Sequence, residues 1–283
     1  MILVTGAAGK TGRHVIRRLG DMGTEVRALV RTPEQIGPLL DLGARAAVPG
    51  DLLKAEDVSR AFDGVRAVYH ICPNIHPREV EIGDVMIAAA RTAGVDRFVF
   101  HSVLLPDVEA MPHHWLKFQV ERRLAESGLS FSILRPCAYM QNLSVHVPQI
   151  TMRGRLEVPY DVEAKFSLVD LRDVAECAAT VLTEPGHEGR TYGLCGPEAI
   201  SHTFMARAFE SALGRPVDAV SVDPAAWERK ARSSGVGDYA VDALKQMFRW
   251  YDRNGFVGSS EDLESLLTRP AHSFADFVAE ELI

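Results

Sequence analysis

A glycine-rich turn at the start of the chain restricts its fold more than any other feature. Residues 5–12, TGAAGKTG, follow the apolar run 2–4 and open a segment whose apolar residues have helical spacing. In a strand–turn–helix unit, Gly6 permits a tight turn, Gly9 lets backbone N–H groups approach an anion, and Gly12 lets the helix pack closely. The N-terminus of such a helix attracts phosphate. The turn therefore predicts a dinucleotide site, although its spacing is G-x-x-G-x-x-G and not the commoner G-x-G-x-x-G.

Strands and helices alternate through the first half of the chain with short connections. Apolar runs predict strands at residues 2–4, 25–30, 44–48, 67–71, 97–103 and 131–134. Helical spacing predicts helices at residues 33–42, 54–62, 78–93 and 112–127. Repeated β–α–β units of this kind form a parallel sheet with helices on both faces. We therefore expect an α/β protein with a Rossmann-type, doubly wound parallel sheet.

The second half predicts a smaller, mainly helical C-terminal substrate lobe. A strand at 166–169, a helix at 170–182 and a strand at 191–194 return to the sheet, whereas residues after 201 have mostly helical spacing, with one more strand at 217–222. The predicted division is an NAD(P)-binding domain at 1–153 and 166–195, and a substrate lobe at 154–165 and 196–283.

The amino-acid composition limits the classes of molecule that the protein can bind. The 283 residues carry a formal net charge of −7, which argues against nucleic acid or an anionic membrane as a partner. No apolar stretch approaches the length of a membrane span, and no secretory signal is evident. Four widely spaced cysteines are typical of buried thiols in a reducing compartment. We expect a cytoplasmic monomer or homodimer that acts on a small molecule.

Two polar residues follow the second and third predicted strands. Arg31 occupies the position that often holds an acid for a ribose 2′-hydroxyl, and an arginine there would pair with a 2′-phosphate. This predicts NADP(H) in preference to NAD(H), although a solvent-exposed arginine is the alternative. Asp51 is either an acceptor for the adenine amino group or the N-cap of the next helix.

The loop after the fourth strand begins Cys72-Pro73-Asn74 and contains a second proline, Pro77. Two prolines make a rigid loop, and its position beside the switch in strand order predicts contact with the nicotinamide. We therefore assign Cys72 and Pro73 to the cofactor site and Asn74 to the substrate pocket. The alternative is that these groups only satisfy the loop backbone.

Candidate catalytic residues follow the fifth strand. Ser102 lies at its end, and His113, Lys117 and Glu121 have a spacing of four in the next helix, so that they share one face. Hydride transfer to a carbonyl or conjugated system requires a proton donor near the developing negative charge and a cation nearby. Lys117 suits the cation, and Ser102 suits a hydrogen-bond donor. The alternative for Lys117 is a surface ion pair with Glu121.

Several segments together resemble the NmrA-like group of atypical short-chain dehydrogenases/reductases. They are TGAAGKTG, ALVRTPE, GDL, the lysine of HHWLKFQVERRL, SGLSFSILRP with YMQN, and FSLVDLRDVAECAATVL. The resemblance implies that the turn residues and Arg31 bind the dinucleotide and that Lys117 is the family lysine. The full set of cofactor-site residues predicted is Gly6, Ala8, Gly9, Lys10, Thr11, Gly12, Arg31, Asp51, Cys72, Pro73 and Lys117.

The chain departs from the larger superfamily at one position. The tyrosine of the usual Tyr-x-x-x-Lys motif is His113 here. The acid of ordinary alcohol–ketone chemistry is therefore absent, but an imidazole can still carry a proton at neutral pH. We name Lys117, His113 and Ser102 as the candidate catalytic residues.

Residues after the sixth strand complete the predicted substrate pocket. Tyr139 and Asn142 follow that strand, although a packed aromatic is an alternative for Tyr139. No spacing matches a metal site, and no G-x-S-x-G elbow surrounds Ser102. The function expected is an NAD(P)H-dependent oxidoreductase that reduces a small apolar conjugated substrate such as a quinone or enone. The alternatives are an NADP(H)-binding redox-sensing regulatory protein and a redox-neutral natural-product tailoring enzyme.

Overall fold

The computed structural model describes residues 1–281, and the chain forms two compact units. The first unit contains Met1–Asp107, His114–Arg135 and Leu171–Tyr192. The second contains Val108–His113, Pro136–Asp170 and the residues from Gly193 onward. The functional division predicted from the sequence, at 153/154, 165/166 and 195/196, stays a prediction, because compactness does not report which unit binds a ligand.

A seven-stranded sheet forms the centre of the first unit. Its strands, in spatial order, are β10 (Arg190–Leu194), β6 (Phe131–Pro136), β5 (Arg97–His101), β4 (Ala67–His70), β1 (Ile2–Val4), β2 (Val26–Val30) and β3 (Ala46–Pro49). The pairings from β6 across to β3 are parallel. The strand order reverses between β1 and β4, so the carboxyl ends of these two strands mark the switch point where such sheets bind ligands. The Rossmann-type fold expected from the sequence is confirmed.

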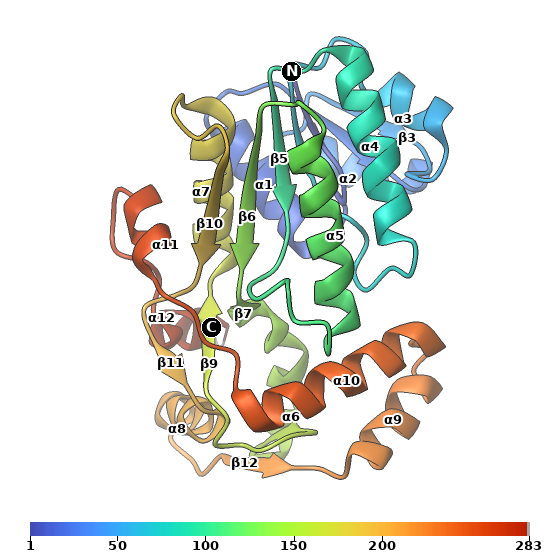
Figure 1. Ribbon diagram of the computed structural model, residues 1–283. Coiled ribbons are helices and arrows are strands. Elements are labelled where there is room, and N and C mark those ends of the chain that lie inside the picture. Colours follow the sequence, from blue (N-terminus) through green and yellow to red (C-terminus); the bar gives the residue numbers. More distant parts are fainter. Residues whose placement is uncertain (282–283) are drawn as a thin grey trace. The chain divides into compact units, whose positions relative to one another are not determined.

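Helices cover both faces of this sheet (Figure 1). They are α1 (Lys10–Asp21), α2 (Ile36–Leu40), α3 (Ala55–Ala61), α4 (Glu79–Ala93), α5 (Pro112–Glu126) and α7 (Leu171–Thr183). On one face, α3, α4 and α5 bury Val58, Met86 and Leu124 in a cluster with strand residues such as Leu3 and Phe98. On the other face, α1 packs against α7. The apolar, β-branched strands are buried on both sides, as a parallel sheet requires.

The prediction of one continuous helix at residues 33–42 is wrong. The segment forms a 3-10 turn, Pro33–Gln35, followed by the short helix α2. Pro38 explains the interruption, because it has no N–H to donate to the carbonyl of Glu34 four residues earlier.

The second unit is built from two small sheets and several helices. Its strands are β7 (Ala138–Tyr139), β9 (Phe166–Val169) and β11 (Ala199–Ile200) in one sheet, and β8 (Arg155–Val158) and β12 (Asp218–Ser221) in the other. Its helices are α6 (Val147–Arg153), α8 (His202–Leu213), α9 (Pro224–Ser233), α10 (Asp238–Asn254), α11 (Glu261–Leu266) and α12 (Phe274–Glu281). Short 3-10 turns at Met140–Asn142 and Ser144–His146 precede α6. The mainly helical character expected of this part is confirmed.

All four cysteines are buried and none forms a disulfide, as the sequence predicted. In the second unit, the Cys137 thiol donates to the Ala138 carbonyl oxygen at 3.6 Å, and burial raises the pKa of Cys137. Among the residues described, no helix combines the length and the apolar character that crossing a bilayer requires.

Candidate functional site

The turn between β1 and α1 has the geometry that its glycines predict. Gly6 has a φ of +58°, in the left-handed region, and a Cβ there would lie 2.8 Å from Ile71 Cβ. A Cβ on Gly12 would lie 2.4 Å from the Gly6 carbonyl oxygen and 2.7 Å from Ala7 Cα. Both contacts are shorter than folded proteins allow. The two glycines thus permit a turn folded back on the helix that follows it.

The first turn of α1 presents its backbone N–H groups without competition. Gly9 is the N-cap and has no side chain that could cap the helix. No acidic residue lies in the first turn, where Lys10 is exposed and Thr11 and Gly12 are buried. The N–H groups at a helix start and the positive end of its dipole together form an anion site. This turn therefore suits a pyrophosphate.

Arg31 directly follows β2 and is exposed. The Gln35 side-chain oxygen accepts hydrogen bonds from the backbone N–H groups of Arg31, at 2.9 Å, and Thr32, at 3.3 Å, so the backbone here is fixed. The Arg31 guanidinium makes no ion pair with any residue between 1 and 281. It is therefore available to an external phosphate.

Asp51 does not cap a helix, and that alternative is wrong. Helix α3 begins at Ala55 with Lys54 as its N-cap. The Asp51 carboxylate instead accepts a hydrogen bond from the Leu53 backbone N–H at 3.0 Å, and its own N–H donates to Asp57. Asp51 is exposed after β3, and its role toward an adenine stays a prediction.

The loop after β4 contains a strained residue. Ile75 is buried with a φ of +49°, which a β-branched residue rarely adopts and which costs about 1–3 kcal/mol. Cys72 is buried and burial raises the pKa of its thiol, so it stays protonated. Pro73 is half-buried and Asn74 is exposed. The loop thus presents Pro73 and Asn74, and not the Cys72 thiol.

Lys117 is almost completely buried and forms an ion pair that the sequence did not predict. Its Nζ lies 2.6 Å from Glu79 Oε1 and 3.3 Å from the His101 carbonyl oxygen. Lys117 and Glu79 are 5% and 1% exposed. The predicted alternative, a surface pair with Glu121, is therefore wrong. An ammonium has three N–H donors, and these two contacts use two of them.

Two histidines surround this pair, at the last positions of the adjacent strands β4 and β5. His70 Nδ1 forms a hydrogen bond with Thr5 Oγ1 at 2.9 Å, and His101 Nδ1 lies 2.6 Å from the Tyr69 hydroxyl. Burial, reinforced by the Lys117 ammonium, lowers the pKa of both histidines to about 3. Lys117 is thus held by one carboxylate among neutral imidazoles. Sequence reasoning missed the histidines, although their place at strand ends is a signal that would have found them.

Ser102 and Glu121 belong to a second polar cluster. The Ser102 hydroxyl donates a hydrogen bond to Glu121 Oε1, and Arg135 Nε donates to the same oxygen at 3.0 Å. Glu121 is 4% exposed. Glu121 and Arg135 were not among the candidate site residues. Ser102 is therefore engaged with a carboxylate one helical turn beyond Lys117.

The remaining candidates lie in the second unit. His113 is 8% exposed near the start of α5. Tyr139 is half-buried in β7, paired with Val169 of β9, and Asn142 is exposed in the following 3-10 turn. Within residues 1–281, no group of three or more His, Cys, Asp or Glu side chains gathers as a set of metal ligands.

Comparison with known proteins identifies the family. Residues 1–276 match the NmrA-like family. The chain belongs to this family. One of its relatives is the NAD(P)H azoreductase of Xenophilus azovorans, 32% identical over 279 residues that cover 98% of this chain and 96% of the relative.

Two further comparisons extend over almost the whole chain. A (4-alkanoyl-5-oxo-2,5-dihydrofuran-3-yl)methyl phosphate reductase of Streptomyces griseus is 33% identical over 285 residues, which cover 99% of this chain and 97% of the relative. The crystal structure of an NADPH-dependent quinone oxidoreductase from Escherichia coli, complexed with NADPH, has a TM-score of 0.87 at 26% identity and covers 100% of both chains.

Proposed function

We propose that this chain is an NADP(H)-dependent oxidoreductase that transfers a hydride to a small, apolar, conjugated acceptor such as a quinone or an enone. The observation that carries the proposal is the turn at residues 5–12, where Cβ atoms on Gly6 and Gly12 would overlap the backbone and neighbouring side chains. This turn opens a helix whose N-cap is Gly9 and whose first turn contains no acidic residue within the described residues. Both features fit a dinucleotide pyrophosphate.

The residues of the first unit suit distinct parts of the cofactor. Backbone groups of Ala8, Gly9, Lys10, Thr11 and Gly12 would hold the pyrophosphate. Arg31 would pair with the 2′-phosphate, because it is exposed at the end of β2 and has no ion-pair partner in residues 1–281. Asp51, Pro73 and the backbone of Cys72 would line the adenine and nicotinamide ends. When bound, the reduced nicotinamide supplies the hydride.

The relatives favour conjugated acceptors. They are named as reductases of azo compounds, of an alkanoyl dihydrofuranone phosphate, and of quinones. Each class presents a π system that delocalises the negative charge left by hydride addition. A reductase of such acceptors needs a cation or hydrogen-bond donor near that charge more than it needs a tyrosine acid.

Lys117 suits this role because its position is fixed. The Glu79 carboxylate and the His101 carbonyl oxygen accept hydrogen bonds from two of the three Lys117 N–H donors. These two contacts fix the direction of the third N–H. A donor held in place before the reaction stabilises developing charge without reorganisation. His113 is the proposed proton source. Ser102 donates to Glu121, so it would contribute only if that hydrogen bond were exchanged for one to the substrate.

The first test is binding and turnover. We would titrate the purified protein with NADPH and NADH and then follow nicotinamide absorbance with a panel of quinones and enones. We expect NADPH to bind more tightly than NADH and to be consumed only when an acceptor is present. NADPH binding without consumption on any acceptor would contradict a reductase and favour the redox-sensing alternative.

A substitution at Arg31 tests the cofactor assignment. Arg31→Ala should weaken NADPH binding by about 10- to 100-fold, because it removes charged hydrogen bonds worth about 1.5–3 kcal/mol, and leave NADH binding unchanged. Arg45→Ala, an exposed arginine before β3, is the matched control and should bind both cofactors as the wild type does. Equal NADPH affinity in the two variants would refute the role of Arg31.

A paired substitution tests Lys117. Lys117→Ala alone would leave the Glu79 carboxylate buried without its cation, so folding and catalysis would be confused. The double variant Lys117→Met with Glu79→Gln removes both charges together. We expect it to bind NADPH within about threefold of wild type and to lose turnover by about 100-fold or more. Lys230→Ala, on the exposed part of α9, controls for loss of a lysine. Wild-type turnover in the double variant would exclude Lys117 from catalysis.

A further inference from the structure

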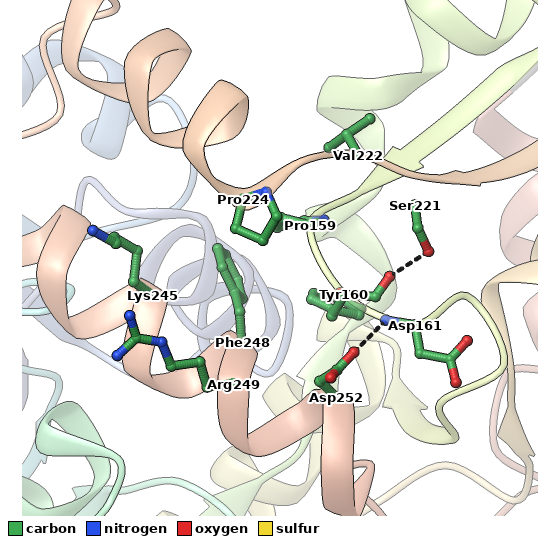
Figure 2. Close-up of a pocket in the computed structure, with 10 residues that line it drawn as sticks. All are labelled: Pro159, Tyr160, Asp161, Ser221, Val222, Pro224, Lys245, Phe248, Arg249 and Asp252. Carbon is green, nitrogen blue, oxygen red and sulfur yellow. Dashed lines mark hydrogen bonds between the residues drawn. The ribbon is translucent and has the colours of Figure 1, made fainter.

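A pocket of about 440 Å³ lies entirely within the second unit (Figure 2). Its walls come from the loop after β8, from the segment between β12 and α9, and from α10. None of the residues predicted to bind the dinucleotide or to act in catalysis lines it. Its volume falls within the range of small-molecule sites, about 300–1,000 Å³.

The apolar part of the pocket is a rigid set of rings. Phe248 packs against Trp227, with ring centroids 4.7 Å apart at 87°, and against Tyr160 at 5.5 Å. Pro159 and Pro224 add two more inflexible walls. The Tyr160 hydroxyl points toward His202, with Oη 3.4 Å from Nε2, and burial raises the pKa of Tyr160, so this side chain is neutral. Such walls favour a flat ring, which gains contact area and a ring–ring geometry.

Cations and carboxylates occupy different sides of this ring set. Figure 2 shows Lys245 and Arg249, one helical turn apart on α10, on one side of the Phe248 ring, and Asp161 on the other. The carboxylates of Asp252 and Asp161 accept hydrogen bonds from backbone N–H groups of the loop after β8. Asp252 Oδ1 accepts from the Asp161 N–H at 2.8 Å, and Asp161 Oδ1 accepts from the Glu163 N–H at 2.9 Å.

The two cations differ in what they already bind. Lys245 pairs with Glu228, which also accepts from Arg232. Arg249 is exposed and makes no ion pair with any residue of the described chain. Its planar guanidinium can take a carboxylate or sulfonate through two parallel hydrogen bonds. Arg249 is therefore the cation of this pocket that no carboxylate of the described chain neutralises.

We propose that this pocket binds a planar aromatic acid, with the ring against Phe248 and Tyr160 and the carboxylate or sulfonate on Arg249. Lys245 adds a second positive charge on the same side of the ring. The site is independent of the hydride transfer proposed above, since it uses no residue assigned to that reaction.

Calorimetric titration of the full-length protein with 1-naphthoate tests the site. The neutral analogue 1-naphthalenemethanol has the same ring without the charge. We expect the acid to bind at least about tenfold more tightly than the alcohol, and to do so with or without saturating NADPH. Charged hydrogen bonds of this type contribute about 1.5–3 kcal/mol, equivalent to a factor of about 10–150.

Two arginine variants locate the binding. Arg249→Ala should weaken naphthoate binding by about tenfold or more and leave naphthalenemethanol binding unchanged. Arg253→Ala, an exposed arginine one turn further along α10 and outside the pocket, should bind naphthoate as the wild type does. Phe248→Leu should weaken both ligands, with folding verified by circular dichroism. Equal affinity for acid and alcohol, or unchanged naphthoate binding by Arg249→Ala, would overturn the proposal.

Discussion

Individual residues near the switch point have partners that lie far away in the sequence. Lys117 was expected either in the active site or in a surface pair with Glu121, four residues away. Its carboxylate partner is Glu79, 38 residues earlier. Glu79 follows an irregular loop and begins a helix, so no local pattern marks it as a partner. The sequence predicts that Lys117 lies on a helix face near β5, but only the packing of α4 beside α5 decides which carboxylate meets it.

The buried ion pair allows a stability prediction at this scale. Glu79→Gln should lower the free energy of unfolding at pH 7 by about 3–5 kcal/mol, because it leaves the Lys117 ammonium buried without a counter-charge. Adding Lys117→Met should restore most of the loss. Urea unfolding of both variants measures the effect, with Glu81→Gln as a surface control, since Glu81 pairs with Arg78 in solvent. A single variant as stable as the wild type would mean that water reaches Lys117.

The agreement between predicted and observed elements depends on how much pattern each segment carries. The turn between β1 and α1, and the boundaries of α5 and β9, follow from glycines and apolar spacing in the segments themselves. Strand β8 was not predicted: it lies in the segment 154–165, which the sequence assigned only to the substrate lobe, and it pairs with β12, which begins 63 residues later in the chain. Its four residues alone have too little pattern to identify a strand.

The glycine turn gives a prediction at the scale of an element. Gly12→Ala places a Cβ 2.4 Å from a backbone oxygen that cannot move without opening the turn. We expect a loss of about 1–3 kcal/mol in unfolding free energy and a loss of NADPH binding. Gly37→Ala in α2 is the matched control, because nothing lies within 4 Å of its Cβ position. Thermal melts and fluorescence titration of both proteins decide the matter. Normal NADPH affinity in Gly12→Ala would place the dinucleotide elsewhere.

Across the whole molecule, both units keep neutral histidines in their interiors. Burial lowers the pKa of His70 and His101 to about 3 in the first unit and that of His202 to about 4 in the second. In the unfolded chain each titrates near 6.5. Between these values the unfolded state binds more protons, so stability is full above pH 6.5 and declines as the pH falls toward the folded values.

The size of this pH effect on stability follows from the pKa values of the folded and unfolded states. For each of these histidines, the free energy of unfolding should be about 2 kcal/mol lower at pH 5 than at pH 7. Urea unfolding at the two pH values measures this. His70→Asn, which keeps a polar atom near Thr5, should reduce the pH effect by about one histidine's share. An identical pH dependence in His70→Asn and wild type would show that His70 titrates normally when folded.

The first unit is built from three separate stretches of the chain, and this affects its folding during synthesis. Helix α1 buries Val15, Ile16 and Leu19, and α7, against which it packs, ends at Thr183. About two-thirds of the chain must leave the ribosome before these helices can meet. Until then the nascent chain exposes one apolar face of its sheet. We therefore expect a fragment that ends before residue 171, and so lacks α7, to aggregate.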